Sequence, residues 1–110
     1  AFVDLQREAY GDIQPVSTAQ SPRAAFDAAL ALAETQGWTI ARADAAAGVI
    51  EATATTFWYG FTDDIVIRVR PEGEGARVDA RSVSRVGRSD LGANAARLRP
   101  YLAELRARLA

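Results

Sequence analysis

The sequence predicts an α+β fold in which two helices pack on one face of a four-stranded antiparallel meander, in the order α-β-β-β-β-α. Apolar residues recur at helical spacing in one segment near each end of the domain. Four strand-like runs lie between these segments, and the turns that join successive runs are short, which favours antiparallel pairing. We divide the 110 residues into an extended N-terminal segment, 1–20, and a single α+β domain, 21–110.

The first helix is predicted to begin after Ser21, because serine is a good N-cap and the following Pro22 suits the first helical position. Gly37 is suited to closing its far end. The apolar stripe of this helix is Phe26, Ala29, Leu30 and Ala33. Upstream, residues 13–18 are compatible with a short strand, which Pro15 restricts to a sheet edge.

The four strand-like runs are residues 38–43, 49–57, 64–70 and 76–84. Because side chains alternate along a strand, each run has two faces. The apolar face, whose small residues let a helix approach closely, carries Ile50, Ala52, Ala54, Ile65, Ile67, Val69, Val78, Ala80 and Ser82. The opposite face carries Glu51, Thr53, Arg68, Arg70, Arg77, Asp79 and Arg81. We interpret these charges as cross-strand pairs on a solvated face, with a partner-binding face as the alternative.

The last helix has a single apolar stripe whose members repeat at spacings of four and three. Its members are Leu91, Ala95, Leu98, Leu102, Leu105 and Leu109. Arg97, Arg99, Arg106 and Arg108 lie off this stripe, and the last two suit the negative end of the helix dipole. Pro100 lies inside the helix and is expected to kink it rather than end it, because the stripe continues in phase.

Composition argues against an enzyme. The chain has no histidine, cysteine or lysine, which excludes an imidazole base, a thiolate nucleophile, a Schiff-base amine and the usual zinc sites. We expect no cofactor. Asp63 and Asp64 are adjacent in a strand and therefore point to opposite faces, so a carboxylate enzyme built on them or on Asp90 is the weakest alternative. A net charge of −1 gives the chain no overall positive electrostatic field that would attract nucleic acid. No apolar run is long enough to span a membrane.

One candidate site lies at an end of the sheet. In a meander, the second and fourth strands end at the same edge, where the last helix also begins and Trp38 enters its strand. The candidate anion- or sugar-binding residues are Trp58, Tyr59, Phe61, Asp63, Asp64, Ser84, Arg85, Arg88, Ser89 and Asp90. The structural alternative is that Ser89 or Asp90 only caps the helix, that the aspartates pair with Arg85 or Arg88, and that the aromatic residues only close one end of the core.

Three runs of the sequence resemble an uncharacterised bacterial family, domain of unknown function 1499. They are residues 48–56, residues 58–61 continued by 63–69, and residues 78–95, within a likeness that extends from about Tyr10 to the end. The resemblance implies a bacterial domain that often follows a signal or transmembrane segment, and it brings no reaction, ligand or functional residue. The order of elements is also similar to the helix-grip modules of outer-membrane assembly lipoproteins, which is a likeness of fold alone.

These observations lead us to expect a non-catalytic binding or interaction module of the bacterial cell envelope. Its expected partner is a small anionic ligand at the end of the sheet, or an envelope protein on the arginine-rich face. The chain begins at Ala1 without methionine, so we expect a processed or trimmed chain with an upstream signal peptide or membrane anchor. The expected location is periplasmic or membrane-attached and extracytoplasmic, with the cytoplasm as the alternative.

Overall fold

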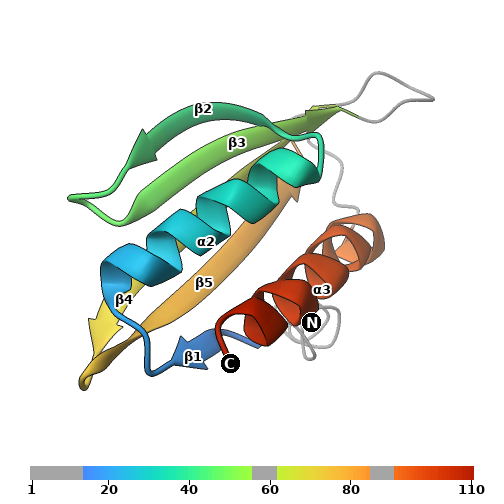
Figure 1. The fold of residues 1–110 in the computed structure, drawn as a ribbon. Helices are drawn as coiled ribbons and strands as arrows, with labels where there is room; N and C mark the ends of the chain where they lie inside the picture. The colour runs from blue at the N-terminus through green and yellow to red at the C-terminus, as the bar shows by residue number, and fades with distance from the viewer. Residues whose placement is uncertain (1–13, 56–61, 85–90) are drawn as a thin grey trace, which may run out of the picture.

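A computed structural model of the chain describes residues 14–55, 62–84 and 91–110. The elements are β1 (Val16–Thr18), α2 (Pro22–Thr35), β2 (Thr39–Asp44), β3 (Val49–Thr55), β4 (Thr62–Glu72), β5 (Gly75–Ser84) and α3 (Leu91–Arg108). The strands form one sheet in the order β1-β5-β4-β3-β2, with every neighbouring pair antiparallel. Both helices lie on the same face of this sheet, as Figure 1 shows. The predicted α+β class, the meander β2–β5 and the packing of both helices on one face are confirmed.

The sheet has five strands, which corrects the four that we predicted. The additional strand is β1, at the position where the sequence allowed a short edge strand, and it pairs with the start of β5. Val16 is fully buried, and the Thr18 hydroxyl donates a hydrogen bond of 2.7 Å to the Leu109 carbonyl beyond the end of α3. Gly75 faces the Thr18 carbonyl so closely that no Cβ fits between them. Tertiary contacts therefore hold a strand that is too short to show alternation.

The ends of α2 are those that the sequence predicts. The Ser21 hydroxyl accepts a hydrogen bond of 3.1 Å from the Ala24 N–H, and Gly37 adopts a φ of 82° just after the helix. The buried face is broader than predicted, because α2 packs both on the sheet and against α3. Leu32 is buried and Leu30 is only partly buried, whereas the predicted stripe included Leu30 and left out Leu32.

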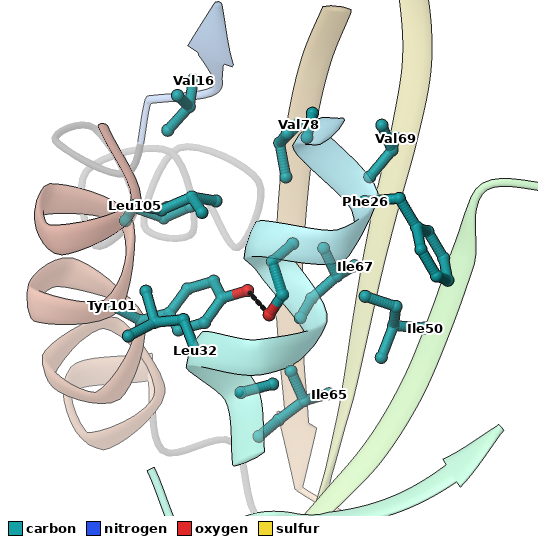
Figure 2. Packing of buried hydrophobic residues seen from close by; sticks show 14 of the residues in the cluster. Val16, Phe26, Leu32, Ile50, Ile65, Ile67, Val69, Val78, Tyr101 and Leu105 are labelled. Atoms are coloured by element: carbon teal, nitrogen blue, oxygen red, sulfur yellow. Dashed lines mark hydrogen bonds between the residues drawn. The ribbon is translucent and has the colours of Figure 1, made fainter. Parts of the chain in front are cut away.

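Helix α3 continues through Pro100, which lies on its exposed side. The predicted stripe is confirmed at Leu98, Leu102, Leu105 and Leu109, all of which are buried. The predicted stripe omitted Tyr101, which is fully buried between the two helices. Its hydroxyl donates a hydrogen bond of 2.8 Å to the Ala29 carbonyl of α2 (Figure 2). Its ring lies 5.0 Å from the ring of Trp38, so one side chain joins α3 to α2 and to the start of β2.

The two faces of the sheet differ as the alternation predicts. Ile50, Ile65, Ile67 and Val78 are fully buried beneath the helices. The opposite face, which we call the open face, is covered by no helix in the part of the chain that the structure describes (Figure 1). Among the described residues, Asp63 and Ser82 depart from the apolar character of the covered face, since both are polar and buried.

Gly48 provides a test of the β2–β3 turn. It has a φ of 70°, its carbonyl accepts a 2.7 Å hydrogen bond from the Val69 N–H, and an added Cβ would collide with the Val69 carbonyl oxygen. We expect Gly48→Ala to lower the free energy of unfolding by about 3 kcal/mol in urea titrations, from conformational strain plus the collision. The matched control is Gly73→Ala, at a φ of 58° with open space around it, which should lose only about 1–2 kcal/mol. Equal losses would contradict this account of Gly48.

Tyr101 provides a second test, because burial raises the pKa of its hydroxyl well above the usual value. At neutral pH, Tyr101→Phe should lose about 1 kcal/mol of unfolding free energy through the missing hydrogen bond. Above about pH 10 the unfolded tyrosine ionises while the folded one keeps its proton. Above that pH the wild type should therefore lose about 1.4 kcal/mol of unfolding free energy per pH unit, a loss that the Tyr101→Phe variant does not share. The two stability curves should converge and cross near pH 11, and parallel curves would show that Tyr101 ionises freely in the fold.

Candidate functional site

The covered face carries one buried ion pair, at the end of the sheet where we predicted a site. Asp63, near the start of β4, is 5% exposed. Arg97 of α3 reaches it with an Nη1–Oδ2 distance of 2.8 Å, and the same nitrogen lies 3.1 Å from the Ser82 hydroxyl of β5. The Arg97 side chain is 18% exposed. The pair therefore ties the middle of α3 to two strands.

This geometry confirms one expectation and adds a contact that the sequence did not predict. Asp63 faces the helices and Asp64 faces away from them, so the two neighbouring carboxylates do not converge. Arg97 lies off the apolar stripe, and its side chain turns towards the sheet, where it supplies the counter-charge that a buried carboxylate needs. The sequence does show an arginine one residue before the buried Leu98, but it does not show which aspartate is buried.

Most of the predicted site falls outside the described residues. These are Trp58, Tyr59, Phe61, Arg85, Arg88, Ser89 and Asp90. Ser84 ends β5 directly opposite Asp63, so those two positions are brought together as the meander predicts. Trp38 also lies where it was expected, immediately before β2, and it is buried against Tyr101. The anion site at this end of the sheet remains a prediction.

The open face carries a second candidate site on β4 and β5. Here the strand register places Arg68 opposite Asp79, Arg81 opposite Val66, and Arg70 opposite Arg77. These strands border a hollow of about 600 Å³. Its lining residues are Val66, Arg68, Arg70, Asp79, Ala80 and Arg81. Three exposed arginines thus surround one hollow, and we call Arg68, Arg70 and Arg81 the arginine patch.

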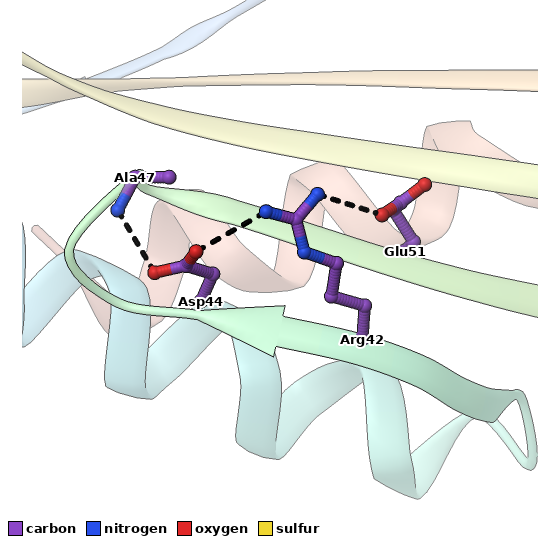
Figure 3. A network of polar contacts seen from close by, with 4 residues as sticks. All are labelled: Arg42, Asp44, Ala47 and Glu51. Carbon is purple, nitrogen blue, oxygen red and sulfur yellow. Dashed lines mark hydrogen bonds and ion pairs between the residues drawn. The ribbon is translucent and has the colours of Figure 1, made fainter.

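The acids of the open face bind other arginines. Arg77 lies 3.5 Å from Asp79 and 3.9 Å from Glu72. Arg42 of the edge strand β2 lies 3.2 Å from both Glu51 and Asp44 (Figure 3).

Hydrogen bonding also shifts the pKa values of the Arg42 network. Asp44 has a pKa below its usual value, chiefly because its carboxylate accepts a hydrogen bond from the Ala47 N–H. The pKa of Arg42 is raised, first by its hydrogen bond to Glu51 and then by that to Asp44. Both groups therefore stay charged at neutral pH. Arg42 binds the carboxylate of Glu51, which we had expected to pair with the arginines of β4 and β5.

The arginine patch has no acidic side chain within ion-pair distance among the described residues. This corrects our interpretation that Arg68, Arg70 and Arg81 form cross-strand pairs. Arg70 moreover lies directly opposite another arginine, and like charges in that position destabilise a sheet. The arrangement supplies several guanidinium groups suited to binding carboxylate or phosphate oxygens.

Comparisons with known proteins agree with the resemblance seen in the sequence. A family model with the description "Protein of unknown function (DUF1499)" matches residues 1–105, which is nearly the whole chain. A search of proteins with curated descriptions finds no match. Among the described residues, no helix has the length and apolar character needed to cross a membrane.

The ion pair of Asp63 and Arg97 predicts a large and non-additive effect on stability. Arg97→Met should lose about 3 kcal/mol of unfolding free energy, because it leaves a carboxylate buried without a counter-charge. The double variant Asp63→Leu/Arg97→Met should be more stable than Arg97→Met alone, since no buried charge remains. A double-mutant cycle measured by urea unfolding checks this. Arg42→Met, which breaks only exposed pairs, is the control and should lose far less. Additive losses would show that the two charges do not interact.

Proposed function

We propose, from the premise that this chain belongs to the DUF1499 family of proteins of unknown function, that it is a non-catalytic binding module that takes an anionic partner on the open face of its sheet. The observation that carries this proposal is the arginine patch, three exposed guanidinium groups around one hollow without acidic partners among the described residues. A hollow of about 600 Å³ is within the usual range of ligand sites, about 300–1,000 Å³.

The chemistry of arginine favours an anion as the partner. A guanidinium is always charged, is weakly hydrated, and presents planar donors that match carboxylate and phosphate oxygens. Arg68 and Arg70 lie on one strand with Arg81 on the next, so an anion above β4 and β5 is within reach of all three.

A binding role is better supported than catalysis. The chain has no histidine, cysteine or lysine to act as base or nucleophile. The buried carboxylate of Asp63 is bound to Arg97 and Asp64 points the other way, so the described aspartates form no acid–base pair. We retain a carboxylate enzyme that also uses Asp90 as the weakest alternative.

The end of the sheet is the second candidate surface. Its case rests on the predicted aromatic residues, on Arg85 and Arg88, and on the convergence of Asp63 with Ser84 in the sheet register. A small anionic ligand is the partner proposed for that site. For the whole module we propose a place in the bacterial cell envelope, periplasmic or membrane-attached, on the ground of the family resemblance. The proposed envelope partner is then a protein or ligand with negative charge.

A thermal-shift series with inorganic tripolyphosphate and poly-glutamate tests the proposal. A ligand at about a hundred times its Kd stabilises a native protein by about 2.7 kcal/mol, which should raise the midpoint of a domain this small by roughly 10 °C. We expect saturable shifts in the wild type and their loss in Arg68→Ala/Arg81→Ala. The matched control is Arg23→Ala/Arg108→Ala, which removes the same charge from exposed helix pairs and should keep the shifts.

The same series separates the two surfaces. Shifts that survive in Arg68→Ala/Arg81→Ala but vanish in Arg85→Ala/Arg88→Ala would place the site at the end of the sheet. Equal loss in the helix control would reduce the effect to general charge attraction, which high salt screens. The absence of any shift in the wild type would overturn the proposal.

A further inference from the structure

The open face also carries an apolar line beside the arginine patch. Val49 of β3, Val66 of β4 and Val83 of β5 all point away from the helices. The register sets Val49 opposite Arg68, and Val66 opposite both Glu51 and Arg81. The three valines are therefore diagonal neighbours across three strands, and we call them the valine diagonal. Val83 is 53% exposed, the largest exposure of any large hydrophobic side chain in the part of the chain described.

Charges of opposite sign flank the valine diagonal. Arg68 and Arg81 occupy the parallel diagonal on one side, with Arg70 one step beyond Arg68. Glu51 and Asp64 occupy the parallel diagonal on the other side. Diagonal neighbours on one face of a sheet lie about 7–8 Å apart, so the valines extend over roughly 15 Å. An α-helix rises 1.5 Å per residue, and about ten residues, or three turns, cover that length.

These dimensions fit an amphipathic helix better than a small anion or a lipid surface. A single phosphate would leave the valines in water, whereas a helix can place an apolar stripe on them. An anionic bilayer laid on this face would meet the carboxylates of Glu51, Asp64 and Asp79 as well as the arginines. A helix about 10 Å wide can instead set its acidic flank on the arginine side alone.

We infer that the anionic partner is an amphipathic acidic helix of another protein, its apolar stripe on Val49, Val66 and Val83 and its acidic flank on Arg68, Arg70 and Arg81. This inference rests on the proposed function, because it assigns a partner to the same face. It adds apolar contacts with the valine diagonal, which binding of an anion by charge alone does not require. The mode is that of a helix bound through spaced apolar anchors, with charge pairs fixing its direction.

The experiment uses two labelled peptides of identical composition and charge and measures binding to this chain by fluorescence anisotropy. One peptide places leucines at helical spacing with glutamates on one flank, and the other has the same residues in scrambled order. We expect the amphipathic peptide to bind at least about tenfold more tightly. Val66→Thr/Val83→Thr, which keeps shape and strand propensity, should weaken it roughly fourfold for each lost methyl contact. Binding of tripolyphosphate should not change in Val83→Thr alone, because Val83 is not among the residues that line the hollow.

The outcomes distinguish this inference from the proposed function. Equal affinity for both peptides, with no effect of the valine changes but loss in Arg68→Ala/Arg81→Ala, would overturn the helix and leave an anion-binding face. Stronger binding to phosphatidylglycerol vesicles than to either peptide would overturn it in favour of a membrane surface. No binding of peptides, vesicles or tripolyphosphate would overturn both. Unchanged unfolding midpoints of the variants show that lost binding is not lost folding.

Discussion

The pleat of β4 is the constraint on which the rest of this structure depends. Ile65 and Ile67 are fully buried against the helices, and the alternation of a strand then forces Val66 and Arg68 to the other side. A shift of one residue would bury two arginines and expose the isoleucines, so the register has no near competitor. The same alternation orders β5, which shares its longest pairing with β4. The arginine patch is therefore held in place by the hydrophobic core beneath it.

The layer of helices sets which face stays open. Both helices need the apolar face, and together they occupy it, joined by the hydrogen bond from Tyr101 to the Ala29 carbonyl. Tyr101 supplies apolar area and a hydroxyl that must find an acceptor once buried. The helix carbonyl of Ala29 can accept it beside its own helical bond because a carbonyl oxygen has two lone pairs. The Asp63–Arg97 pair joins α3 to the sheet by charge. Within the described ranges, no helix or strand covers the open face.

The sequence was sufficient for the elements and their faces, and insufficient for the pairing of charges. Alternation and helical spacing are local properties, so Ile65, Val78 and Leu98 could be assigned to the core without coordinates. The sequence only allowed the short strand β1, because three residues show no period and its position depends on Gly75 and Leu109, far away in sequence. Local patterns therefore recovered the meander β2–β5 and left β1 as an option at the sheet edge.

The partners of charged side chains were predicted wrongly for a different reason. Long side chains on neighbouring strands have several partners within reach, and the choice among them depends on twist and on competition. Glu51 was expected to serve the arginines of β4 and β5, but Arg42, directly opposite it on β2, binds it instead. Likewise, Arg97 lies off the apolar stripe of α3, and nothing in the local pattern assigned it to Asp63, to which it binds. Topology correctly brought the positions of Asp63 and Ser84 together at one end of the sheet, while the sequence offered the arginine-rich face as the alternative partner-binding surface without showing which arginines lack acidic partners.

The arginine patch has no acidic partner among the described residues although the chain as a whole is slightly acidic. A net charge of −1 says only that the acids outnumber the arginines by one, not where they lie. Several carboxylates are engaged elsewhere, by Arg23 and Arg108 on the helices and by Arg42 at the sheet edge. Those arginines offset these carboxylates locally, and Arg77 takes up Asp79 and Glu72, so among the described residues the arginine patch is left without an acidic partner. Like charges on adjacent strands oppose sheet stability, and Arg70 lies directly opposite Arg77. Asp79 and Glu72 offset the charge of Arg77, whereas Arg70 has no acidic partner among the described residues, so an added negative charge on this face would act first on the arginine patch.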